Sequence, residues 1–158
     1  MRRATLPSPI GNLLLEGDGE TLNALRMVGA QRPAPAPRGE AFAAARTQLE
    51  QYFAGEREGF ELSLAPRGGD FEQRVWAALQ QIPYGETESY RSIARRVGAP
   101  SAARAVGLAN GRNPIAVIIP CHRVIGADGS LTGFGGGLAR KRFLLDLEAG
   151  VGSLLSPG

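Results

Sequence analysis

The spacing of apolar residues changes at Arg67-Gly68-Gly69, and this change limits the fold more than any other feature of the chain. Before it, short alternating segments at 12–16 and 22–28 flank Gly17 to Glu20, which is a hairpin signal. After it, apolar residues recur at helical spacing. The sequence therefore predicts an α+β chain, with a small sheet-and-helix domain over residues 1–66 and a mostly helical domain over residues 67–158.

The first domain is expected to hold two further elements after its hairpin. A helix is predicted over residues 41–53 and a strand over residues 60–64, while the alternating prolines of residues 31–38 favour an extended loop. No constellation of chemically reactive side chains occurs in residues 1–66. We therefore interpret this region as a supporting domain.

The second domain opens with a predicted helix that Asp70 caps and that places Trp76 in the core. Two short helices follow over residues 87–97 and 101–110, joined by a tight turn containing Gly98, with Ser101 as the cap of the second helix. Such a pair is a helix-turn-helix pattern. A final helix is predicted over residues 138–148, with one apolar face made of Ala139, Phe143, Leu144 and Leu147.

The second helix of the pair is rich in small residues around a single arginine, Arg104. A helix that reads bases in the major groove would carry several long polar side chains, which this one lacks. Small residues permit close approach to the minor groove, where Arg104 could fill the space left by a flipped nucleotide. The alternative is close helix packing with Arg104 pointing to solvent, and the helix pattern alone leaves both open.

Cys121 and His122 are the only cysteine and the only histidine of the chain, and they are adjacent. The apolar run 116–119 before Pro120 predicts a buried strand that delivers the thiol to a turn. One Cys and one His cannot complete a tetrahedral metal site, so no metal is expected. Cys121 is then either an inert packed thiol or a nucleophile with His122 as its base; Glu148 is the preferred carboxylate to orient the imidazole, with Asp146 as the alternative.

The charge of the chain is uneven although its net value is only +3. Residues 85–158 carry nine basic and five acidic side chains, and 17 of the 18 basic residues of the whole chain are arginine. Arginine suits phosphate and base contacts, although a GC-rich coding sequence or a thermophilic source would also enrich it. The sequence shows no membrane span and no secretory signal, and its single Cys favours a reducing interior such as cytoplasm or nucleus.

Several segments together resemble one family, the O6-alkylguanine-DNA alkyltransferases. The most specific is the segment 113–124, which ends in Pro120-Cys121-His122-Arg123-Val124. The other matching segments follow the order and spacing of the family over roughly residues 70–149: 83–86, Ser89-Tyr90, 103–107 and 144–148.

The resemblance implies direct DNA repair, in which one alkyl group passes irreversibly from guanine O6 in duplex DNA to Cys121. Each molecule then acts once, without a cofactor. His122 is expected to act through a water as the base on Cys121, with Glu148 orienting His122. Asn113 is expected to brace the turn that presents the site.

The resemblance also implies how DNA is held. Arg104 would replace the flipped nucleotide, and Tyr90 would hydrogen-bond the base and help to rotate its phosphate. Backbone carbonyls of Cys121 and Val124 would accept from the guanine amino group, while the amide of Gly135 would donate to O6. The DNA-contacting set in the minor groove is expected to be Ser101, Ala103, Arg104, Ala105 and Gly107, and the protein is expected to be a monomer.

Two residues depart from the pattern of the family. Phe134 stands where many members have Tyr, and Gly135 stands where some have Ser, so the preferred alkyl group and activity on O4-alkylthymine stay open. The amino-terminal zinc site of some relatives has no ligands in residues 1–66.

Three other functions compete with alkyl transfer. A non-enzymatic alkyltransferase-like lesion binder would lack the nucleophile, so Cys121 argues against it. A helix-turn-helix regulator is disfavoured by the alanine-rich second helix. A cysteine hydrolase is disfavoured because no oxyanion or acyl-binding motif occurs.

Overall fold

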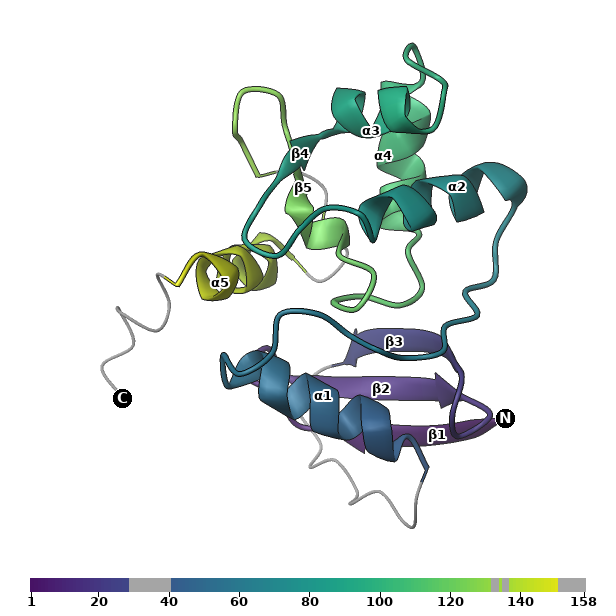
Figure 1. Cartoon of the computed structure of the whole chain (residues 1–158), viewed down its shortest axis with the longest axis vertical. Helices are drawn as coiled ribbons and strands as arrows, with labels where there is room; N and C mark the ends of the chain where they lie inside the picture. The colour runs from purple at the N-terminus through teal and green to yellow at the C-terminus, as the bar shows by residue number, and fades with distance from the viewer. Residues whose placement is uncertain (29–40, 132–133, 135–136, 151–158) are drawn as a thin grey trace. The chain divides into compact units, whose positions relative to one another are not determined.

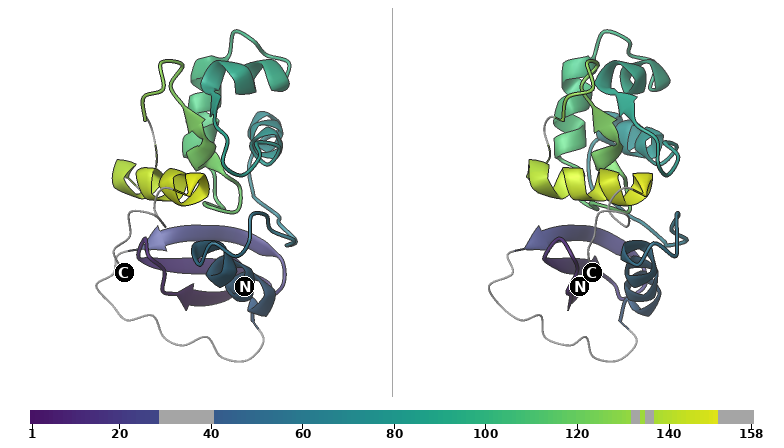
Figure 2. Two further views of the ribbon diagram at one scale, coloured as in Figure 1. Left: turned by 60° about the vertical axis from the view of Figure 1, so that its left-hand side comes forward. Right: turned by 90° about the vertical axis from the view of Figure 1, so that its left-hand side faces the viewer.

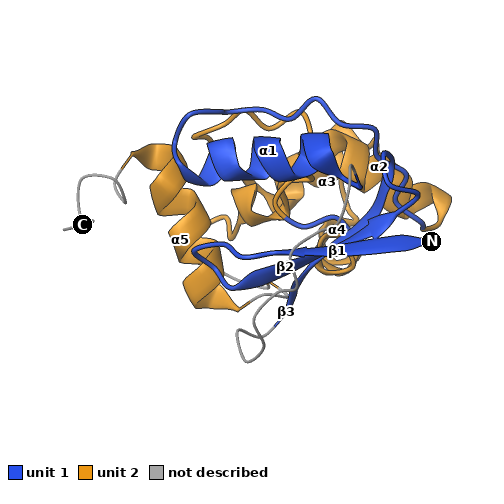
Figure 3. Ribbon diagram, turned by 90° about the horizontal axis from the view of Figure 1, so that it is seen from below, with its two compact units in different colours: residues 1–67, 114–116 blue, residues 68–113, 117–158 orange. Residues whose placement is uncertain are grey.

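A computed structural model describes residues 1–28, 41–131, 134 and 137–150, and in this part the chain forms two compact units (Figure 3). Unit 1 comprises Met1–Arg67 with Pro114–Ala116, and unit 2 comprises Gly68–Asn113 with the described residues from Val117 onward. Unit 1 is a sheet with a helix and unit 2 is mostly helical, so the predicted α+β class is confirmed. No helix in the described ranges is long and apolar enough to cross a membrane.

Unit 1 is built on an antiparallel sheet in the order β1 (Arg2–Leu6), β2 (Asn12–Gly17) and β3 (Leu22–Val28). The predicted hairpin joins β2 to β3, and its turn is closed by the Asp18 carboxylate, which accepts from the Glu20 and Thr21 amides at 2.9 and 2.7 Å. Helix α1 (Ala43–Phe53) runs along one face of the sheet (Figure 1), as the helical spacing predicts.

The predicted strand over residues 60–64 is wrong except at its end. Only Leu64 forms a bridge, to Leu22. The backbone of Glu61 pairs instead with the side chain of Gln48 on α1, whose Oε1 accepts at 2.8 Å and whose Nε2 donates at 3.2 Å. The alternating pattern therefore marked an extended segment. The backbone hydrogen bonds of Glu61 in this segment are made with a side chain rather than with a neighbouring strand.

The predicted strand over residues 116–119 is also wrong. Residue Ile115 makes a single bridge to Leu25 of β3, and the chain then enters a turn in which Val117 has a φ of 70°. A β-branched residue with left-handed backbone costs about 1–2 kcal/mol, so the surrounding structure must hold it. The run is apolar because it is buried throughout, and burial alone does not specify a strand.

Unit 2 packs three helices together, namely α2 (Asp70–Leu79), α3 (Tyr90–Arg96) and α4 (Ala103–Gly111) (Figure 2). Trp76 of α2 is 2% exposed and donates its Nε1–H to the Ala109 carbonyl of α4 at 2.8 Å, which confirms its place in the core. The helix-turn-helix prediction corresponds to α3 and α4.

Two short strands and two further helical segments complete unit 2. Strand β4 (Glu88–Ser89) pairs in parallel with β5 (Val124–Ile125). A single turn of 3-10 helix, η1 (Cys121–Arg123), leads into β5 and packs against α5 (Leu138–Ala149).

Three predicted helix starts need correction. Residues 88 and 89 form β4, so α3 begins at Tyr90, where Ser89 caps it by accepting from the Ser92 amide at 3.1 Å. Ser101 does not cap α4, because the chain turns again at Ala102 before the helix begins. Gly69 rather than Asp70 precedes α2, and its amide donates to the Glu72 carboxylate at 3.0 Å.

The predicted apolar face of the last helix is wrong as well. Leu144 is buried as expected, but Phe143 is 37% exposed and Ala139 is exposed. The side of α5 that turns inward carries Lys141 and Glu148 together with Leu144. Two charged side chains can occupy this face because both find partners inside unit 2.

Candidate active site

Cys121 begins η1 directly after Pro120, and its side chain is buried. The approach to it is fixed by Asn113, whose Nδ2 donates to the Ile119 carbonyl at 2.7 Å. Burial raises the pKa of the Cys121 thiol, while a hydrogen bond from Asn113 and the positive charge of Lys141 act in the opposite direction. The thiol therefore needs a base nearby to become a nucleophile.

His122 is fully buried and is tied to Glu148, whose Oε2 lies 2.7 Å from its Nε2. An ionised carboxylate can only accept, so Nε2 carries the proton and Nδ1 keeps its lone pair. Burial lowers the pKa of His122, and the Glu148 carboxylate opposes this shift. Nδ1 has no hydrogen-bond partner in the described part of the chain, so the residue that follows Cys121 carries an unprotonated nitrogen that is able to accept a proton.

Arg123 locks the carboxylate that holds His122. Its Nε donates to Glu148 Oε1 at 2.8 Å, one terminal nitrogen donates to Glu148 Oε2 at 3.0 Å, and the other donates to the Ile82 carbonyl at 2.7 Å. The guanidinium also lies 5.7 Å from the centre of the Tyr84 ring. A paired arginine keeps a buried carboxylate ionised, so Glu148 stays an acceptor.

Lys141 is a second buried cation close to the site. Its side chain is fully buried on α5, and Nζ donates to the Val124 carbonyl at 2.6 Å. Burial lowers the pKa of Lys141, whereas a negative charge on Cys121 would raise it. The sequence patterns predict no role for Lys141, although it is the only lysine of the chain and is distinguished by that alone.

The alternative carboxylate, Asp146, lies elsewhere. It is half-buried and its nearest charged partner is Arg142, one turn earlier on α5, at 4.0 Å. Glu148 is therefore the carboxylate that contacts His122.

Helix α4 has one buried and one exposed side. Val106, Ala109 and Asn110 are buried, whereas Ser101 in the preceding turn and both Arg104 and Ala105 are exposed. Ala103 and Gly107 are half-buried, and a side chain at Gly107 would meet the Tyr90 ring at 3.8 Å. The structure thus brings Tyr90 of α3 against α4 and leaves Arg104 on the open side.

The predicted base pocket is described only in part. Val124 is fully buried in β5, and its carbonyl is the acceptor for Lys141. Phe134 is half-buried, and its carbonyl accepts from the Gly137 amide at 2.9 Å. Gly135 lies outside the described residues.

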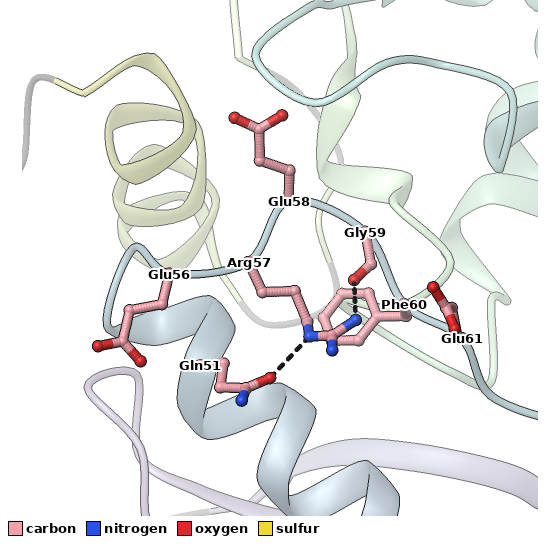
Figure 4. Close-up of a pocket in the computed structure, with 7 residues that line it drawn as sticks. All are labelled: Gln51, Glu56, Arg57, Glu58, Gly59, Phe60 and Glu61. Atoms are coloured by element: carbon pink, nitrogen blue, oxygen red, sulfur yellow. Dashed lines mark hydrogen bonds between the residues drawn. The ribbon is translucent and has the colours of Figure 1, made fainter.

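Unit 1 carries an open pocket of about 470 Å³ (Figure 4). Arg57 crosses it, held by Gln51 Oε1 at 2.8 Å and by the Gly59 carbonyl at 3.1 Å. The pocket contains neither a thiol nor an imidazole, because the only Cys and His of the chain belong to unit 2. The complete lining is Gln51, Glu56, Arg57, Glu58, Gly59, Phe60 and Glu61.

Both parts of the chain match known protein families. Residues 70–150 match the 6-O-methylguanine DNA methyltransferase, DNA binding domain, and residues 1–66 match the 6-O-methylguanine DNA methyltransferase, ribonuclease-like domain.

Similar proteins cover nearly the whole chain. A methylated-DNA–protein-cysteine methyltransferase of Mycobacterium bovis is 59% identical over 148 residues, which are 91% of this chain and 90% of that protein. One from Methanosarcina acetivorans is 52% identical over 153 residues, 94% of this chain and 98% of that protein. A crystal structure of Mycobacterium tuberculosis OGT in complex with DNA is 57% identical, with a TM-score of 0.88 over 96% of this chain and 94% of that chain. The motif around Cys121, the two-unit fold and these likenesses agree, and the chain belongs to the 6-O-methylguanine DNA methyltransferase family.

Proposed function

We propose that this protein repairs DNA by transferring the alkyl group of O6-alkylguanine in duplex DNA to the sulfur of Cys121, once per molecule. The observation that carries the proposal is Nδ1 of His122: it is unprotonated, buried and without a hydrogen-bond partner among the described residues, and it belongs to the residue that follows the only cysteine of the chain. A base in that state is what a buried thiol with a raised pKa requires.

The first step is loss of the Cys121 proton. A water between the thiol and Nδ1 of His122 passes the proton to the imidazole. The Nε2–H of the imidazole remains hydrogen-bonded to the Glu148 carboxylate. Glu148 stabilises the imidazolium that forms, and the positive charge of Lys141 favours the thiolate. Asn113 braces the turn that positions the sulfur.

The second step is an in-line displacement. The thiolate forms an S–C bond to the alkyl carbon as the C–O6 bond breaks, and the bonding pair stays with the guanine. Guanine then takes a proton, which restores its normal base-pairing form. The thioether that remains has no route back to a thiolate, so the reaction ends after one transfer.

DNA binding uses the open side of α4. Small residues at Ala103, Ala105 and Gly107, with Ser101 before them, allow close approach to the minor groove, and Arg104 takes the place of the flipped nucleotide. Tyr90 hydrogen-bonds the flipped base and helps to rotate its phosphate.

The expected base pocket also includes Val124, Phe134 and Gly135. The size of alkyl group that the protein prefers, and whether it also acts on O4-alkylthymine, depend on these residues. The protein acts as a monomer without a cofactor or a metal, in the compartment that holds DNA.

Intact-protein mass spectrometry tests this function. After incubation with duplex DNA containing O6-methylguanine, the wild-type protein is expected to gain one methyl group, located on Cys121, and Cys121→Ala is expected to gain none. A folded wild-type protein that stays unmodified in excess substrate would refute alkyl transfer and leave lesion binding as the function.

A further inference from the structure

Leu108 is the only large apolar residue on the exposed side of α4. It is 59% exposed, a larger fraction than that of any other large apolar residue in the helices that the structure describes. The DNA-contacting set that the sequence predicts does not include this position. The leucine side chain therefore projects from a helix surface that is otherwise made of small residues and arginines.

The neighbours of Leu108 on this surface are charged or small. Residues four positions apart lie one helical turn apart, about 6 Å along the axis, so Arg104 lies one turn before Leu108 and Arg112 one turn after it. Both arginines are exposed, and Arg112 lies 3.6 Å from the Glu72 carboxylate. A Cβ added at Gly111, the other neighbour in the following turn, would meet none of the described atoms within 4 Å. The surface beside Leu108 is therefore open and has a cation on each side.

Such a surface suits DNA better than a protein partner. The centre of a protein interface is depleted of charge and gathers several large apolar side chains, whereas this surface has one leucine between two arginines. The minor groove offers matching partners, because phosphates line its edges and attract arginine, while apolar side chains can enter between its base steps. Helix α4 also lies within residues 70–150, which match a DNA binding domain.

We propose that Leu108 is a further DNA-contacting residue, which enters the minor groove one helical turn from Arg104 and packs against bases and sugars there. This inference rests on the proposed function, in which Arg104 fills the space of the flipped nucleotide. The contact removes apolar area from water, so it stabilises the complex without any charge. Because a minor groove exists only in a duplex, Leu108 favours double-stranded over single-stranded DNA.

The first test compares the wild type with Leu108→Ala. Alanine favours the helix and the leucine is largely exposed, so α4 is expected to stay folded. The Kd is measured for an undamaged duplex that is short enough to hold one protein molecule, and for one of its single strands. Leu108→Ala is expected to bind the duplex about tenfold more weakly, and the single strand within about twofold of the wild type. The matched control is Leu138→Ala on α5, a leucine that is 51% exposed, and both of its Kd values are expected to stay within about twofold.

The salt dependence of the duplex Kd separates an apolar contact from a phosphate contact. Loss of one phosphate contact reduces the slope of log K against log salt by about 0.9, whereas loss of an apolar contact leaves it unchanged. Leu108→Ala is therefore expected to show the wild-type slope with weaker binding at every salt concentration. A reduced slope would mean that the phosphate contacts of α4 had moved, and would overturn the inference.

A duplex Kd of Leu108→Ala within about twofold of the wild type would also overturn the inference, as would equal losses on duplex and single strand. These results leave the proposed function intact, because methyl transfer to Cys121 is measured separately on duplex DNA containing O6-methylguanine. A wild-type protein that takes no methyl group from that duplex refutes the proposed function and the inference with it.

Discussion

Replacing Arg123 by methionine tests the buried charge cluster behind His122. The substitution removes the three hydrogen bonds that Arg123 donates to Glu148 and to the Ile82 carbonyl. Glu148 is 6% exposed, so its carboxylate would stay buried and keep its contact with His122 while losing the charge of Arg123. Removing one partner of a buried ion pair typically costs about 3–5 kcal/mol, out of a total stability of about 5–15 kcal/mol for a domain.

The assay is thermal unfolding followed by circular dichroism. For a chain of this length a loss of 1 kcal/mol lowers the midpoint by about 2–4 °C, so Arg123→Met is expected to unfold about 6–20 °C earlier than the wild type. The matched control is Arg142→Met on α5, which breaks a pair between the exposed Arg142 and the half-buried Asp146 and is expected to cost about 0–1 kcal/mol. Equal midpoints for Arg123→Met and Arg142→Met would refute the reasoning.

Three further results are expected. Burial lowers the pKa of His122 below its usual 6.5, so the unfolded chain binds this proton at a higher pH than the folded chain does. Stability should hold at neutral pH and fall as the pH drops below about 6.5, whereas the transfer rate should persist to lower pH, because the folded protein keeps His122 neutral there; a rate that already falls above pH 7 as the pH is lowered would contradict the neutral base. Glu148→Gln should slow transfer on the order of 10²-fold in a single-turnover assay, whereas Asp146→Asn should leave it within twofold; the reverse order would reassign the carboxylate. Arg104→Ala should weaken repair of duplex DNA more than reaction with a free O6-alkylguanine base, and equal losses would exclude its gap-filling role.

The sequence was sufficient to find the residues that meet at the site. Cys121 and His122 stood out as the only residues of their type, and the likeness of the last helix to the family singled out Glu148, which the structure places 2.7 Å from His122. The helix pair that became α3 and α4 was also clear, because Gly98 and the helical spacing on both sides are local signals.

The partners within the cluster could not be predicted, because they depend on contacts distant in sequence. In the sequence, Arg123 is indistinguishable from a surface or phosphate-binding arginine. Its hydrogen bonds to Glu148 and to the Ile82 carbonyl are seen only in the structure. Lys141 belongs to a helix whose apolar spacing suggested a different inward face. Asn110 is an ordinary polar residue in a helical pattern, and its burial next to the Cys121 carbonyl is seen only in the structure.

The same reason explains the failed strand before Cys121. Residues 116–119 are all buried, and both a buried strand and a buried turn produce such an apolar run. The apolar pattern therefore does not reveal the left-handed backbone of Val117. The outcome matters for chemistry, since a turn followed by η1 brings Cys121 and His122 into one helical turn instead of onto opposite faces of a strand.

The number of alkyl groups accepted per molecule tests the central claim most directly. A fixed amount of protein is titrated with increasing duplex DNA containing O6-methylguanine, and the restored guanine is counted by chromatography after each addition. The proposed irreversible transfer to Cys121 predicts a plateau at one guanine restored per protein molecule, at any excess of substrate and any incubation time. Continued turnover beyond one equivalent, or the same plateau with Cys121→Ala, would contradict it.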